Sequence, residues 1–67
     1  MTVVCPNVAN GLTETQAISL RAALAERYPK FVFWTFGRQA ELVVRMQMVT
    51  SETWRECVAF AAAHIGQ

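Results

Sequence analysis

The chain has 67 residues, of which 54% are hydrophobic and 16% are charged, and its formal net charge is +1. This length accommodates one domain, residues 1–67, and the high apolar content excludes a disordered chain. No apolar run approaches the roughly 18 residues of a membrane span, and a near-neutral charge is atypical of a dedicated nucleic-acid-binding protein.

The chain begins with a predicted strand followed by a loop. Residues 2–5 are β-branched or apolar, which is typical of a short strand. Pro6 ends this strand because proline has no amide hydrogen to donate. Residues 7–11 end in Asn10-Gly11, a dipeptide typical of turns, so we expect a loop there.

A helix is predicted over residues 13–28. Thr13 is a suitable N-cap, and Gln16 three residues later completes a capping box. Pro29 ends the helix because it disfavours the helical conformation of the residue before it. The residues expected to face the core recur at helical spacing and are Ala17, Leu20, Leu24 and Tyr28, with Ile18 and Ala25 on one flank.

An aromatic segment and an alternating segment form a predicted hairpin. Residues 31–36 are rich in aromatic side chains, which favours a strand. Gly37-Arg38 suits a two-residue type II′ turn. Residues 40–49 alternate between apolar and mostly polar positions, which indicates a half-buried antiparallel strand. Its core face would carry Ala40, Leu42, Val44, Met46 and Met48.

A second helix is predicted over residues 51–64, with Thr50 or Ser51 as its N-cap and Gly66 at its C-terminal end. Its apolar stripe consists of Trp54, Cys57, Val58, Ala61 and Ile65. The element order β-α-β-β-α predicts an α+β fold in which both helices pack on one face of a three-stranded mixed sheet. The preferred strand order is 1-3-2, and the alternative is 1-2-3.

The length of the hairpin turn decides which aromatic side chains face the core, because a shift by one residue exchanges the two faces of a strand. A two-residue turn pairs Phe33 with Leu42, places Phe31 and Phe33 in the core, and leaves Trp34 and Phe36 on the opposite face. A three-residue turn does the reverse. In either register at least two aromatic side chains point away from the helices.

These surplus aromatic residues predict an interaction surface, because large apolar patches are rare on soluble monomers. We expect the surface to be centred on Trp34 and Phe36, with Arg38 and Arg45 at its rim, and Phe60 to be the centre of an alternative interface. The expected function is that of a small stand-alone interaction module, an adaptor or inhibitor that binds a partner protein. The alternative is a nucleic-acid-binding regulator, since bases stack on aromatic rings and arginine binds phosphates.

Self-association is also expected. In the 1-3-2 order the strand at residues 31–36 is an edge that carries no charge and no proline. An edge of this kind is a template for a further strand. Pairing with its own copy across a two-fold axis would cover the edge, so the sequence predicts a homodimer.

No residue pattern typical of an enzyme or a metal site is found, so we expect neither catalysis nor a cofactor. Ser51 and His64 are thirteen residues apart on one helix, which separates them by about 20 Å. Cys57 and His64 are roughly 10 Å apart along the same helix, too far to share one zinc ion. A Cys5–His64 dyad is geometrically possible but lacks an orienting group.

Residues 1–7 contain no basic residue and only a short apolar run at 3–5, so we expect no signal peptide. Two cysteines in such a chain are expected to be reduced thiols, which favours a cytoplasmic location. Five of the six basic residues are arginine and alanine is abundant, which points to a bacterial or phage source.

Overall fold

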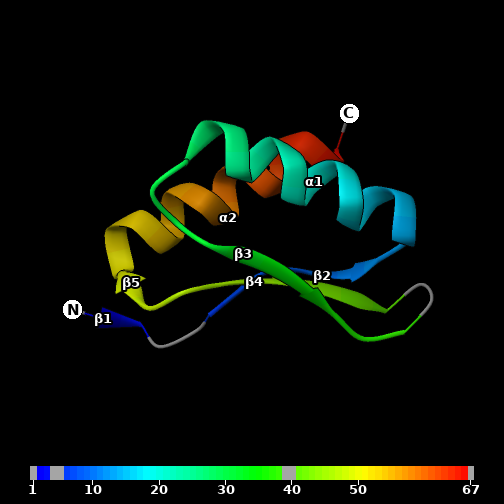
Figure 1. Cartoon of the computed structure of the whole chain (residues 1–67), viewed down its shortest axis with the longest axis horizontal. Coiled ribbons are helices and arrows are strands. Elements are labelled where there is room, and N and C mark those ends of the chain that lie inside the picture. Colours follow the sequence, from blue (N-terminus) through cyan, green and yellow to red (C-terminus); the bar gives the residue numbers. More distant parts are fainter. Residues whose placement is uncertain (1, 4–5, 39–40, 67) are drawn as a thin grey trace.

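Both helices lie on the same face of a three-stranded sheet (Figure 1). The structure is a computed structural model that describes residues 2–3, 6–38 and 41–66. The sheet contains β2 (Asn7–Leu12), β3 (Phe33–Phe36) and β4 (Leu42–Met46), the helices are α1 (Glu14–Arg27) and α2 (Ser51–Ile65), and β1 (Thr2–Val3) pairs with β5 (Val49–Thr50).

The strand order is β2-β4-β3, which is the predicted 1-3-2 order when the strands of this sheet are counted along the chain. The α+β class and the placement of the helices are confirmed. The sheet is antiparallel and not mixed, because β4 lies between β2 and β3 and pairs antiparallel with both. The outer strands therefore run parallel to each other without sharing hydrogen bonds.

The first strand of the sheet is not the predicted one. Thr2–Val3 does form a strand, but it pairs with β5 outside the three-stranded sheet. The segment expected to be a loop is β2, whose Val8 and Leu12 side chains are buried. Its pairing with β4 shifts register twice, and Gly11 has a positive φ of 64°. The Asn10-Gly11 signal therefore marks an irregularity within a strand and not a turn.

The first helix is confirmed together with its capping box. The Gln16 N–H donates to the Thr13 hydroxyl (3.2 Å), and the Thr13 N–H donates to the Gln16 side-chain oxygen (3.0 Å). Ala17, Leu20 and Leu24 are buried and Tyr28 is half-buried. The expected flank is wrong: Ile18 is 61% exposed and Ala25 is also exposed, because the sheet and α2 cover only the narrow stripe.

The hairpin keeps the faces predicted for the two-residue turn but not its pairing. Phe36 pairs with Val43 and Phe33 with Met46, so residues 37–41 connect β3 to β4, with 39 and 40 outside the described residues. Phe33 thus pairs with a residue four positions after its expected partner, Leu42. Because side chains alternate with a period of two, a shift of four leaves every face unchanged.

The long alternating strand ends earlier than predicted. β4 stops at Met46, Met48 is 58% exposed, and Val49 is buried in β5. The alternation of buried and exposed side chains therefore breaks between Met46 and Val49, where the chain leaves β4 and forms β5, which pairs with β1. The predicted position Ala40 lies outside the described residues.

The second helix is confirmed with Thr50 as its N-cap and Gly66 as its C-cap. Cys57 and Ala61 are fully buried, whereas Trp54 is half-buried and its indole N–H donates to the Asn7 carbonyl (2.9 Å). The core between the helices and the sheet contains Val8, Leu12, Ala17, Leu20, Leu24, Phe33, Val44, Met46, Val49, Cys57 and Ala61. Within the described part of the chain, neither helix has the length and apolar character to cross a membrane.

Candidate functional site

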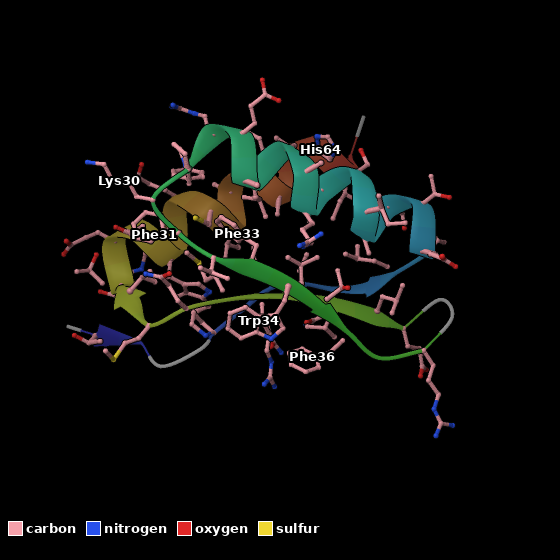
Figure 2. All side chains as sticks on the ribbon, viewed as in Figure 1. Lys30, Phe31, Phe33, Trp34, Phe36 and His64 are labelled. Atoms are coloured by element: carbon pink, nitrogen blue, oxygen red, sulfur yellow. The ribbon has the colours of Figure 1, made fainter. Side chains whose placement is uncertain are left out.

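The face of the sheet opposite the helices carries a group of aromatic and apolar side chains with one arginine. Trp34 and Phe36 lie two residues apart on β3 and point away from the helices, whereas Phe33 points toward them (Figure 2). The register places Arg45 of β4 beside Trp34, and Val43 beside Phe36. We call these four residues, Trp34, Phe36, Val43 and Arg45, the sheet-face cluster.

The side chains of the sheet-face cluster contact one another. The Trp34 and Phe36 rings are 6.1 Å apart between centroids and nearly perpendicular at 73°, a favourable edge-to-face geometry. The Arg45 guanidinium carbon lies 5.2 Å from the centroid of the Phe36 ring, within range of a cation–π interaction. Phe36 is nevertheless 48% exposed, so the cluster presents aromatic surface to solvent.

A polar contact from β2 orients the arginine. The Arg45 Nε donates to the Asn7 side-chain oxygen at 2.7 Å, and the two residues are paired across β2 and β4. The guanidinium is therefore held between Asn7 on one side and the Phe36 ring on the other. This leaves other guanidinium N–H groups able to bind an acceptor, because the group has five.

Two other residues expected at a contact surface, Arg38 and Phe60, lie outside this cluster. Arg38 is exposed in the connection after β3, where its carbonyl accepts from the Glu41 N–H (2.9 Å). Phe60 is on α2, half-buried, and packs edge-to-face on Tyr28 at 6.2 Å. Because α2 lies on the opposite face of the sheet, Phe60 and the sheet-face cluster belong to different surfaces.

Sequence reasoning missed a contact between the helices. The Ser19 hydroxyl and the His64 Nε2 are 2.9 Å apart, and the His64 ring stacks on Phe60 with an angle of 10° between the rings. The pair lines a hollow of about 200 Å³ with Thr15, Gln16 and Ile65. Ser19 and His64 are 45 residues apart on different helices, so no local sequence pattern could have connected them.

This serine–histidine pair has no third group that orients the histidine among the described residues. A serine nucleophile requires a base, a group that orients the base, and donors for the developing oxyanion. Among the described residues, His64 has no hydrogen-bond partner that would orient it as a base, since its other contact is the apolar Phe60 ring. The pair is better explained as a polar link between α1 and α2.

Cys57 is a buried thiol with a raised pKa. Burial raises the pKa of its thiol to about 11, and the charge of Glu56 acts in the same direction. The thiol is therefore protonated near neutral pH and is a poor nucleophile. Among the described residues, no three histidine, cysteine, aspartate or glutamate side chains are placed to hold a metal ion. The considered dyad partner Cys5 lies outside the described residues.

Neither a protein-family model, nor a curated protein, nor a solved structure matches this chain.

Proposed function

We propose that the protein is a small interaction module, an adaptor or inhibitor, that binds a partner protein through the sheet-face cluster. The observation that carries this proposal is that Trp34, Phe36 and Arg45 contact one another on the sheet face opposite both helices, where Phe36 is 48% exposed. Tryptophan and arginine are among the residue types that most often dominate the energy of protein interfaces.

The cluster is ordered before a partner arrives. The β3–β4 ladder fixes the backbone of Trp34 and Phe36, their rings pack edge-to-face on each other, and Asn7 holds Arg45. Binding would therefore immobilise few side chains that are free beforehand, and each such side chain otherwise costs about 0.5–1.5 kcal/mol on association. The exposed Arg45 favours a partner that offers a carboxylate or carbonyl beside an apolar side chain.

A nucleic-acid-binding regulator is the second candidate, because an arginine beside stacked aromatic rings on an open sheet can also bind single-stranded bases. The charges favour the protein partner. The strands of the main sheet contain only one charged residue, Arg45, and the net charge is +1. Phosphate binding normally uses several basic residues and weakens steeply as salt increases.

The test is affinity capture from the native host with the wild-type chain, Trp34→Ala and the control Met48→Ala. Met48 is 58% exposed and lies outside the cluster, so its truncation removes exposed apolar surface without changing the proposed site. We expect Trp34→Ala to stay folded and to lose a protein that both other chains capture, with or without nuclease treatment. Equal capture by all three chains would contradict the proposal, and capture that nuclease or moderate salt abolishes would favour the nucleic-acid candidate.

The proposal includes no catalytic activity and no cofactor, and it places the protein in the cytoplasm. A free and buried Cys57 is compatible with the reducing conditions of that compartment. Arg38 and Phe60 stay candidates for the rim and for a second surface, respectively.

A further inference from the structure

The outer edge of β3 presents backbone groups to solvent. β3 is an outer strand of the sheet and pairs with β4 on one side only. The Gln47 N–H donates to the Val32 carbonyl at 3.2 Å, which fixes the alternation of hydrogen bonds along this antiparallel pair. By the same alternation Trp34 and Phe36 direct their backbone groups toward β4, whereas Phe33 and Thr35 direct theirs outward.

The two outward residues differ in what surrounds them. The Arg21 Nε of α1 donates to the Phe33 carbonyl at 3.1 Å, so this acceptor already has a partner. The described residues supply no partner to the outward N–H and C=O of Thr35. Thr35 is therefore the one position of β3 at which a further strand finds both a donor and an acceptor available.

Exposed apolar side chains lie on both sides of Thr35. On the helix side Ile18 is 61% exposed, and it lines a hollow of about 350 Å³ together with Thr35, Gly37 and Leu42. On the other side Phe36 is 48% exposed. β3 itself carries no charged residue. The flank formed by Ile18, Thr35 and Phe36 thus combines unpaired backbone with apolar surface, which native edge strands normally avoid.

We infer that a second copy of the chain pairs with this flank across a two-fold axis at Thr35. The two Thr35 residues exchange two backbone hydrogen bonds, and the two three-stranded sheets become one antiparallel sheet. Phe36 of each copy then lies opposite Trp34 of the other, and Ile18 of each copy approaches the other beside the axis. A two-fold axis at Phe33 or at Trp34 would instead place the Phe33 carbonyl, to which Arg21 already donates, in the central hydrogen-bonded pairs. With the axis at Thr35, Phe33 lies opposite Gly37 of the other copy, beyond the end of β3, so the central pair does not use this carbonyl.

A second copy is favoured over an unrelated strand because the contact is self-complementary and closes the assembly. The other edge of the sheet is β2, and its two register shifts make it a poor template for a further strand. Two copies therefore satisfy the regular edge of the three-stranded sheet. A typical interface of about 800 Å² per partner would cover roughly a sixth of the 4567 Å² surface.

This inference rests on the proposed function, since it identifies one protein partner as the chain itself and doubles the sheet-face cluster. Sedimentation equilibrium of the wild-type chain should give twice the 7.5 kDa mass of one chain. Ile18→Lys should stay folded, because the side chain is exposed, and should weaken dimerisation at least tenfold. Ala59→Lys adds the same charge to an exposed position of α2 and should leave the dimer intact.

The register is tested by disulfide trapping in a Cys5→Ser background. Thr35→Cys should cross-link on oxidation, because directly opposed hydrogen-bonded residues have Cα atoms about 5.5 Å apart, within the disulfide range of about 4.4–6.8 Å. Val32→Cys should not, since two such residues would lie roughly 20 Å apart. Equal cross-linking of both variants, or of neither, would refute the register, and a 7.5 kDa species at hundreds of micromolar would refute the dimer.

The two proposals fail separately. A monomeric chain whose captured protein is lost in Trp34→Ala would overturn the dimer and support the proposed function. A trapped Thr35 dimer with unchanged capture by Trp34→Ala would support the dimer and overturn the proposed function.

Discussion

Truncation of Leu24 should remove a large part of the stability of this domain. Leu24 lies on α1, is 0% exposed, and belongs to the core between the helices and the sheet. Leu24→Ala removes three carbon atoms, and at about 0.8 kcal/mol for each buried CH₂ the transfer cost alone is about 2.4 kcal/mol. The cavity left behind raises the expected loss to about 3 kcal/mol.

This loss is large relative to the total. Small proteins have roughly 0.05–0.15 kcal/mol of unfolding free energy per residue, or about 3–10 kcal/mol for a chain of this size. Urea unfolding followed by the fluorescence of Trp34 and Trp54 measures the change, with all variants at one protein concentration because any dimer makes stability concentration-dependent. Met48→Ala is the matched control and should change the free energy of unfolding by less than about 0.5 kcal/mol. A loss below about 1 kcal/mol for Leu24→Ala would show that α1 does not pack as described.

Two further predictions concern single residues. Gly37→Ala should lower the free energy of unfolding by about 1–3 kcal/mol, because Gly37 has φ of 103° and an added Cβ would lie 2.8 Å from the Glu41 carbonyl oxygen. Gly11→Ala should lower it by less, because φ is 64° there and the space around an added Cβ is open. If urea unfolding shows the larger loss for Gly11→Ala, the geometry described for the connection after β3 is contradicted. The pKa of the Cys57 thiol is raised from 9.0 to about 11 in the folded chain, so the unfolded chain loses this proton at a lower pH than the folded chain does. The stabilisation from the protonated thiol should therefore be complete below pH 9 and should be lost as the pH rises toward 11. Urea midpoints measured across this range should fall less in Cys57→Ala than in the wild type, and an equal fall in both would refute this assignment.

Local sequence patterns determined the two helices. Thr13 and Gln16 satisfy each other's backbone groups within one turn, and Pro29 excludes helix beyond Tyr28 whatever the rest of the chain does. The apolar spacing of Ala17, Leu20 and Leu24 then selects the buried side. These signals act over three to seven residues, so they can be read without knowing the tertiary contacts.

The face occupied by Trp34 and Phe36 was predictable only as one of two alternatives. Side-chain alternation along β3 requires that these two residues share a face opposite that of Phe33. Which face is buried depends on the pairing of β3 with β4, and the connection of residues 37–41 sets that pairing. Because the actual register differs from the two-residue register by an even number of positions, the faces were right although the partners were wrong.

Contacts between distant segments were decided only by the tertiary structure. Asn10-Gly11 has the local chemistry of a turn, yet the chain continues as β2 because Val8 and Leu12 are buried in the core. The hydrogen bond between Arg45 and Asn7 joins residues 38 positions apart. That between Arg21 and the Phe33 carbonyl, which leaves Thr35 as the available edge position, depends on how α1 lies over β3. Such contacts follow from the packing of whole elements, and the packing is the sum of many weak apolar contacts that no short stretch of sequence encodes.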